Sequence, residues 1–340
     1  MDLKNKEYID KIKSLAREKN AVIFAHYYTR PEIQECADFI GDSLALAQQA
    51  TRVQADILVM CGVHFMGETM KILCPSKKVL IPDMNAGCSL ADSCKAEDLK
   101  KFIEDYKNSL PFTGEALCSI EGPVDVRRTL SEVGPIVVSY VNTSADVKAL
   151  TDIVVTSSNA KKIIDQLPAD AKIIFGPDHN LGSYINSVTC RNMLLWNGAC
   201  HVHSRFSLEA LLQLKKENPG VEVLAHPECK APILAQSDVI GSTKALLEHT
   251  IQSPAKRFII ATESGILFEM QRACPDKEFI PVPPEVTEGV GCSCNECEYM
   301  RMNTLEKLYN CLLNESPEMH VQKETAEKAV SSIQRMLEMS

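Results

Sequence analysis

Short apolar runs alternate with longer segments of helical periodicity along most of the chain. Residues 4–19 carry apolar side chains at helical spacing, and the apolar run of residues 21–25 follows directly. Short apolar strands that alternate with helices are typical of a parallel sheet covered by helices on both faces. The pattern therefore predicts an α/β fold.

Polar residues at fixed spacing divide the chain into three similar copies. In each copy an apolar strand ends in a polar residue, and a hydroxyl residue stands 17 positions further on: His26 and Ser43, Tyr140 and Ser157, His226 and Thr243. An aspartate precedes each hydroxyl residue by five positions, as Asp38, Asp152 and Asp238. Three matches at one spacing indicate an internal repeat, and a repeat dictates the architecture.

Each copy continues with further strands and helices and ends at a cysteine. These cysteines are Cys88, Cys200 and the group Cys292, Cys294 and Cys297. We therefore expect three pseudo-threefold-related α/β/α domains with short parallel sheets around a central cavity that contains a metal cluster. The expected limits are 1–94 for the first repeat with its N-terminal helix, 95–133 for an insertion, 134–200 for the second repeat, 201–297 for the third, and 298–340 for C-terminal helices that pack back on the domains.

Composition narrows the classes of partner. A net charge of −9 argues against a general surface for nucleic acids or acidic membranes. The chain has no run of 18 apolar residues and no apolar segment near its first residue, so we expect a cytoplasmic protein without a membrane span or signal peptide. In that compartment its 14 cysteines are not expected to form a disulfide framework.

The repeated polar residues predict a ligand site. Ligands of open parallel α/β sheets bind beyond the carboxyl ends of the strands. The first strands of the copies are followed there by polar pairs, namely His26 and Tyr28, Tyr140 and Asn142, and His226 and Glu228. Ser43, Ser157 and Thr243 fall at expected helix starts, which attract anions. The alternative for these three hydroxyls is a helix N-cap.

The distribution of cysteines points to a metal. Three thiolates from three domains suit an iron–sulfur cluster, whereas structural zinc usually draws on paired ligands close in sequence. A cluster with three cysteine ligands leaves one iron open as a Lewis acid, a role suited to dehydration. The residues thus predict a non-redox lyase or synthase that acts on a small anionic substrate.

The chain resembles the quinolinate synthase A family, the iron–sulfur enzymes of NAD biosynthesis. The resemblance runs from about residue 21 to 310 outside the insertion. It rests on stretches 25–28, 41–43, 62–69, 86–90, 139–144, 156–160, 177–182, 196–203, 226–229, 241–243 and 303–306. It implies condensation of iminoaspartate with dihydroxyacetone phosphate to quinolinate, phosphate and water, and a functional link to an aspartate-oxidising enzyme.

The resemblance also assigns roles to individual residues. It implies that a [4Fe–4S] cluster is held by Cys88, Cys200 and Cys297, although the run Cys292-x-Cys294-x-x-Cys297 departs from the common C-x-x-C-x-x-C pattern. Glu228 is the expected general base. The remaining roles are proton handling by Tyr28 and His26, orientation of substrate groups by Tyr140 and Asn142, anion binding by Ser43, Ser157 and Thr243, and carboxylate binding by His203 and His226.

Two other functions fit parts of the sequence. A sensor that keeps the cluster and the anion site but lacks turnover predicts bound iron and no product. A structural zinc protein predicts the absence of iron. The other histidines are expected to be ordinary structural residues, namely His64, His179, His201, His249 and His320.

Overall fold

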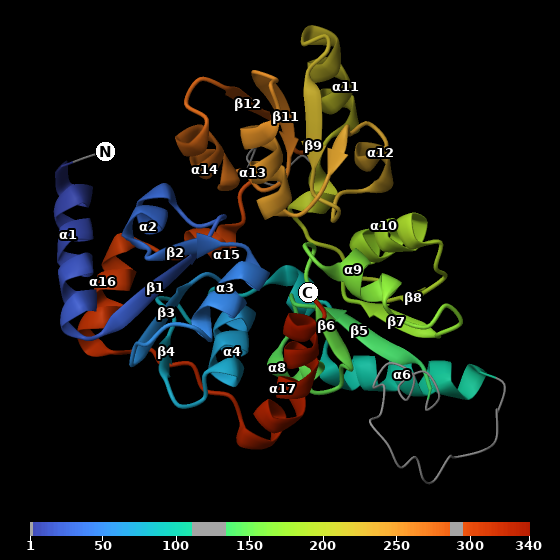
Figure 1. Cartoon of the computed structure of the whole chain (residues 1–340), viewed down its shortest axis with the longest axis horizontal. Coiled ribbons are helices and arrows are strands. Elements are labelled where there is room, and N and C mark those ends of the chain that lie inside the picture. Colours follow the sequence, from blue (N-terminus) through green and yellow to red (C-terminus); the bar gives the residue numbers. More distant parts are fainter. Residues whose placement is uncertain (1–2, 111–133, 286–294) are drawn as a thin grey trace.

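Three four-stranded parallel sheets form the framework of the protein. The computed structural model describes residues 3–110, 134–285 and 295–340, and Figure 1 shows the sheets in three lobes around a common centre. The strand orders are β2-β1-β3-β4, β6-β5-β7-β8 and β10-β9-β11-β12, so each sheet has the same topology. The predicted α/β fold with three short parallel sheets is confirmed, whereas the expected domain limits remain a prediction.

We name the lobes first, second and third unit after their sheets. The first unit contains β1 Ala21–His26, β2 Phe39–Gly41, β3 Ile57–Cys61 and β4 Lys78–Leu80, with α1 Leu3–Glu18, α2 Pro31–Cys36, α3 Ser43–Ala50, α4 His64–Leu73 and α5 Ser89–Asp92. The second contains β5 Ile136–Tyr140, β6 Ile153–Val155, β7 Ile173–Gly176 and β8 Leu194–Leu195, with α8 Ala145–Lys148, α9 Ala160–Asp165 and α10 His179–Thr189. The third contains β9 Glu222–Ala225, β10 Val239–Ile240, β11 Arg257–Ala261 and β12 Glu278–Pro281, with η1 His203–Arg205, α11 Leu208–Glu217, α12 Ala231–Leu234, α13 Thr243–Gln252 and α14 Ile266–Ala273.

The inner strands are buried on both faces, as their continuous apolar sequence predicts. Every residue of β3 and β5 is buried. Phe24 on β1, Phe175 on β7 and Phe258 on β11 are fully buried and belong to one hydrophobic cluster that extends through all three units. The sheets therefore share a core, and this core fixes how their strand ends face one another.

The repeated aspartates connect the first two strands of each sheet. The Asp38 carboxylate accepts the N–H of Ile23 at 2.8 Å, and the N–H of Asp38 donates to the Ile23 carbonyl at 2.9 Å. Asp152 makes the same two bonds to Val137, and Asp238 makes them to Val223, with the bonded residues 15 positions apart each time. We call this pair of bonds the aspartate bridge. Because it fixes the offset between the strands, it also fixes the spacing of the polar residues beyond them.

Helices outside the repeats connect the units. α6, Ala96–Ser109, buries Leu99 and Ile103 against the second unit, while residues 111–133 of the expected insertion lie outside the described part of the chain. α16, Leu305–Asn314, packs on α1, and α15 spans Glu298–Arg301. α17, Lys323–Glu338, contacts α4 of the first unit and β6 and α8 of the second, as Figure 1 shows.

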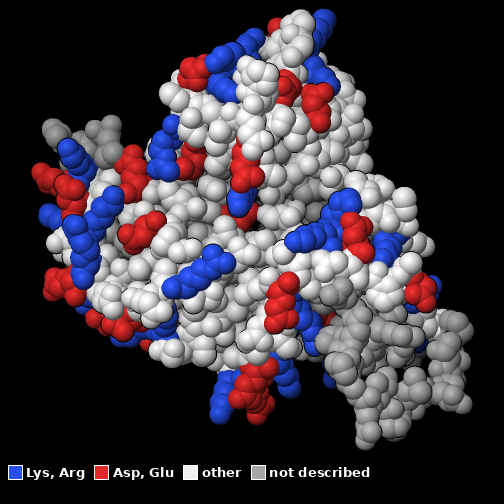
Figure 2. Space-filling view, in the orientation of Figure 1, with Lys and Arg blue, Asp and Glu red and all other residues white. Residues whose placement is uncertain are grey.

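The surface carries charges of both signs. On the face shown in Figure 2, Lys and Arg side chains are interspersed with Asp and Glu. Within the described ranges, no helix has the length and apolar character needed to cross a membrane.

Candidate functional site

One cavity lies where the carboxyl ends of the three sheets meet. It encloses about 720 Å³ of empty space, its open mouth included. Its lining contains every site residue predicted from the sequence: His26, Tyr28, Ser43, Cys88, Tyr140, Asn142, Ser157, Cys200, His203, His226, Glu228, Thr243 and Cys297. These residues come from all three units, so the structure brings the whole predicted set together, and their individual roles remain predictions.

The hydroxyl residues at the helix starts are not the N-caps. Asp42 caps α3, accepting the N–H of Ala45, and Ser242 caps α13, accepting the N–H of Ala245. The N-cap of α9 is Asn159, two residues beyond Ser157. The hydroxyls of the predicted residues are therefore available for other contacts in the cavity, which the N-cap alternative would not allow.

Two histidines have the same local geometry in different units. The Nδ1 atom of His26 accepts the N–H of Tyr28 at 3.2 Å, and the Nδ1 atom of His226 accepts the N–H of Glu228 at 3.4 Å. Burial lowers the pKa of His26 to about 4 and that of His226 to about 3. Both rings are therefore neutral near pH 7, and the proton is on Nε2. In His226 this Nε2–H donates to the Ser157 hydroxyl at 3.1 Å.

A chain of hydrogen bonds crosses the cavity from the first unit to the second. The Tyr28 hydroxyl lies 2.6 Å from the Thr243 hydroxyl and 3.0 Å from the Thr262 hydroxyl. Thr262 in turn contacts Nε2 of His203 at 3.0 Å. The chain continues through the His203 Nδ1 atom, 3.1 Å from Oε2 of Glu228. It ends at the Tyr140 hydroxyl, which donates to Glu228 Oε1 at 2.5 Å.

Glu228 is a buried but ionised carboxylate. Burial alone would raise the pKa of Glu228. The charge and hydrogen bond of His203 and the hydrogen bond of Tyr140 have a larger, opposite effect, and together they lower the pKa to about 2. The Tyr140 pKa is raised well above its ordinary value by burial and by the Glu228 charge. Near neutral pH the pair therefore consists of a carboxylate that accepts and a phenol that donates.

The three predicted cysteine ligands occupy equivalent positions in the fold. In each unit, the third residue after the third strand (β3, β7 or β11) donates its backbone N–H to a carbonyl. The residue that carries this carbonyl stands two positions before the cysteine. These bonds are His64 to Ala86 before Cys88 (2.7 Å), His179 to Gly198 before Cys200 (2.7 Å) and Ser264 to Asn295 before Cys297 (3.1 Å). Cys292 and Cys294 lie outside the described residues. The structural repeat thus extends to the loops that carry the cysteines.

These three cysteines are half-buried and lie near the starts of short helical turns. Burial raises the pKa of Cys88 to about 11 and of Cys297 to about 12, and it raises the pKa of Cys200 well above the ordinary value. Backbone N–H groups of the following helical turns oppose this shift in all three. Without a metal the thiols are protonated, so a metal that binds here must displace their protons.

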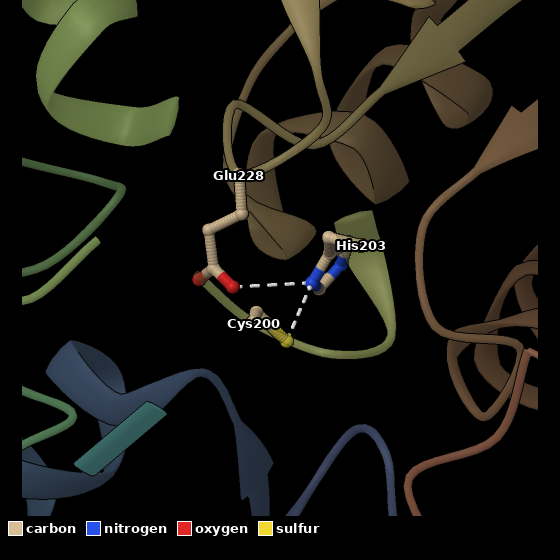
Figure 3. Close-up of side chains that lie close together, drawn as sticks. All are labelled: Cys200, His203 and Glu228. Atoms are coloured by element: carbon tan, nitrogen blue, oxygen red, sulfur yellow. Dashed lines mark hydrogen bonds and ion pairs between the residues drawn. The ribbon is translucent and has the colours of Figure 1, made fainter. Parts of the chain in front are cut away.

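A second set of possible metal ligands includes one of these cysteines, Cys200. Donor atoms of Cys200, His203 and Glu228 lie within 4.8 Å of one another, and Figure 3 shows the imidazole between the thiol and the carboxylate. Nδ1 of His203 is 3.3 Å from the Cys200 sulfur. In the described parts of the chain no other three donors of this kind are so close, so the three thiols are spread more widely around the cavity.

Sequence reasoning missed several residues of the cavity. His201, expected to be structural, lines it and lies 2.5 Å from the Ser89 hydroxyl, and Glu263 lines it from the third unit. Thr262 connects Tyr28 to His203. Thr262 and Glu263 directly follow β11. The sequence contains a signal for Thr262 and Glu263, because they are polar residues that directly follow the third strand of their copy. The sequence analysis used only the polar residues that follow the first strand of each copy.

Comparisons with known proteins show the family to which the chain belongs. The family described as quinolinate synthetase A protein matches residues 10–338. The quinolinate synthase of Microcystis aeruginosa is 49% identical, over 97% of this chain and 94% of its own length. That of Synechocystis is 48% identical, over 98% and 96%, and that of Chloroherpeton thalassium is 45% identical, over 100% and 97%. The chain therefore belongs to the quinolinate synthetase A family of enzymes.

Proposed function

We propose that the protein condenses iminoaspartate with dihydroxyacetone phosphate to give quinolinate, phosphate and water. The observation that carries this proposal is the convergence of hydroxyls, histidines, tyrosines, Glu228 and three thiols on one cavity. Together the two substrates bring carboxylates, a phosphate and groups that must gain or lose protons. The cavity offers matching donors for anions and a buried acid–base pair in Tyr140 and Glu228.

The three thiols fit an iron–sulfur cluster. They line one cavity from three equivalent loops, and they are too far apart to surround a single ion as closely as the group in Figure 3 does. In a polynuclear cluster each thiolate binds a different iron, and backbone N–H groups at the sulfurs tune the centre. We assign Cys88, Cys200 and Cys297 as ligands of a [4Fe–4S] cluster. When bound, its fourth iron supplies Lewis-acid chemistry for dehydration.

Anions are bound by the helix starts and the neutral histidines. The first turns of α3 and α13 present free N–H groups and a positive dipole end beside Ser43 and Thr243. His26 points an Nε2–H donor from the first unit, because its Nδ1 is occupied by the Tyr28 N–H. We assign Ser43, Ser157, Thr243 and His226 to phosphate and carboxylate groups, and Asn142 to the orientation of substrate beside Tyr140.

Proton transfers are assigned to Glu228, Tyr140 and Tyr28. In the free site a pKa of about 2 makes Glu228 a weak base. Negative charges of bound substrates disfavour the carboxylate and raise its pKa toward the working range. Tyr140 then returns or receives the proton at Oε1, while His203 holds Oε2 in place. Tyr28 reaches the same chain through Thr262.

A mononuclear metal site is the second candidate. It is favoured by the close group of Cys200, His203 and Glu228, which offers one sulfur, one nitrogen and one oxygen donor. Such a mixed set with an open position is typical of catalytic zinc. In that case the remaining cysteines would be neutral thiols.

Anaerobic purification followed by metal, sulfide and product analysis tests the proposal. We expect about four irons and four sulfides per chain for a [4Fe–4S] cluster. We also expect quinolinate when fresh iminoaspartate and dihydroxyacetone phosphate are supplied. A cluster without quinolinate would favour the sensor, and one zinc without sulfide would favour the mononuclear site. Cys88→Ser should abolish cluster uptake but leave a zinc site at Cys200, His203 and Glu228 intact.

A further inference from the structure

Two buried carboxylates bond directly to the backbone of two candidate cluster ligands. Asp178 Oδ2 accepts the N–H of Cys200 at 3.1 Å, and Glu263 Oε1 accepts the N–H of Cys297 at 2.9 Å. Both acidic residues are 0% exposed. Buried polar groups are costly unless they are hydrogen-bonded, so the presence of two acidic side chains beside these cysteines requires an explanation.

The two carboxylates are equivalent in the repeat. Asp178 is the second residue after β7, and Glu263 is the second residue after β11, in the same position of their sheets. In the first unit this position, after β3, is occupied by Val63. The arrangement is thus shared by the second and third units and absent beside Cys88.

Each carboxylate also bonds to its own segment. Asp178 Oδ1 accepts the N–H of Leu181 at 2.7 Å as the N-cap of α10, and Glu263 Oε2 accepts the N–H of Gly265 at 2.6 Å. One oxygen therefore fixes the carboxylate locally, and the other reaches a cysteine 22 or 34 residues away in the sequence. Arg301 lies 3.8 Å from Glu263 Oε1 and opposes the effect of burial, which raises the pKa of Glu263 to about 8.

We propose that Asp178 and Glu263 are positioning residues that hold the backbones of Cys200 and Cys297 so that their thiolates are pre-arranged for the metal centre. This inference rests on the proposed function, since it takes these cysteines as ligands. Each of these two hydrogen bonds fixes the backbone N–H of a cysteine relative to the residues that follow a strand of the same unit's sheet or of the neighbouring one. Partners of metal ligands act in this way by orienting the ligands before the metal binds.

Asp178→Asn and Glu263→Gln separate this role from general stability. An asparagine still caps α10 through its oxygen, but its NH₂ group then faces the Cys200 N–H as a second donor. The Glu263→Gln variant would lose one of the two acceptor contacts in the same manner. Asp152→Asn and Asp238→Asn are matched controls in the same two units, because they weaken carboxylate bonds to the N–H groups of Val137 and Val223 away from any cysteine.

Each protein is reconstituted anaerobically with iron and sulfide, and iron release to the chelator ferrozine is timed. We expect release about 10–100-fold faster in Asp178→Asn and Glu263→Gln than in the unmodified protein. Their electron paramagnetic resonance spectra after reduction should also be altered. The controls should lower the thermal midpoint of the metal-free protein but release iron at the normal rate.

Cys200→Ser sets the rate expected for a missing ligand. Normal iron release and normal spectra in both carboxylate variants would overturn the inference while leaving the proposed function intact. Equally fast release in the controls would also overturn it, because the effect would then be general destabilisation. Failure of the unmodified protein to take up iron and sulfide would overturn the proposed function and this inference together.

Discussion

At the scale of the residue, the environment of Glu228 determines its chemistry. It is 3% exposed, yet each carboxylate oxygen has a donor, from Tyr140 on one side and His203 on the other. These bonds favour the ionised form over the neutral one, and this preference exceeds the opposing effect of burial. The same bonds hold the side chain in one orientation, which a general base needs.

Replacing Glu228 by Gln should reduce turnover and leave the metal content unchanged. The amide keeps the shape of the side chain but cannot take up a proton. We expect kcat to fall about 10²–10⁴-fold, measured as quinolinate formed under saturating substrate. Glu222→Gln is the matched control, because Glu222 on β9 of the same unit bonds to His249 and Ser253 outside the cavity. Full activity of Glu228→Gln would refute the assignment of the base.

At the scale of the element, the aspartate bridges explain why three dissimilar sequences build the same site. Each bridge ties the beginning of the second strand to the first strand by a side-chain and a backbone bond. The bridge therefore fixes the parallel register of the two strands independently of the side chains that follow them. The polar residue after the first strand and the hydroxyl residue after the second consequently reach the same edge of the sheet.

Asp38→Ala should destabilise the protein through the first of these bridges. The variant leaves the Ile23 N–H without its charged acceptor, and we expect a loss of about 1–3 kcal/mol in the free energy of unfolding. Urea unfolding followed by circular dichroism measures this loss. Asp10→Ala, an exposed position on α1, should stay within about 0.5 kcal/mol of the unmodified protein. Equal stability of the two variants would show that the bridge contributes nothing.

At the scale of the whole molecule, hydrogen bonds between units complete the site. Tyr28 of the first unit reaches Thr243 of the third, Tyr140 of the second reaches Glu228 of the third, and Ser158 of the second donates to Asp42 of the first at 2.6 Å. α17 adds contacts between the first and second units. The cavity therefore depends on the relative placement of all three lobes.

Protonation of the buried histidines should lower the stability of the protein below about pH 6.5, while Glu263, whose pKa burial raises to about 8, contributes in the opposite direction. Unfolded histidine has a pKa near 6.5, whereas the folded values for His26 and His226 are about 4 and 3, so the unfolded state binds more protons in this window. The contribution of these histidines is thus complete above pH 6.5 and falls as the pH drops, by up to about 1.4 kcal/mol per pH unit for each histidine. His201, whose pKa burial also lowers, acts in the same direction.

Urea unfolding at several pH values between 6.5 and 4.5 measures this slope. The window reaches the ordinary pKa of Glu228, 4.5, only at its lower end, so the loss from this carboxylate is small above about pH 5. His226→Gln keeps a side-chain N–H donor but removes one titrating group, and it should reduce the slope. An unchanged slope in this variant would show that His226 does not couple folding to protons.

The sequence by itself determined the fold class, the threefold repeat and a part of the residues that line the cavity. This was possible because strand periodicity and the 17-residue spacing are local properties, and parallel strands bring equivalent positions to one edge. Only the tertiary structure decided that Asp38 and its equivalents are bridges, that Thr262 joins Tyr28 to His203, and that Asp178 and Glu263 accept hydrogen bonds from cysteine N–H groups. Those contacts join residues from different strands or units, and their partners are set by how the elements and lobes pack, which no local spacing encodes.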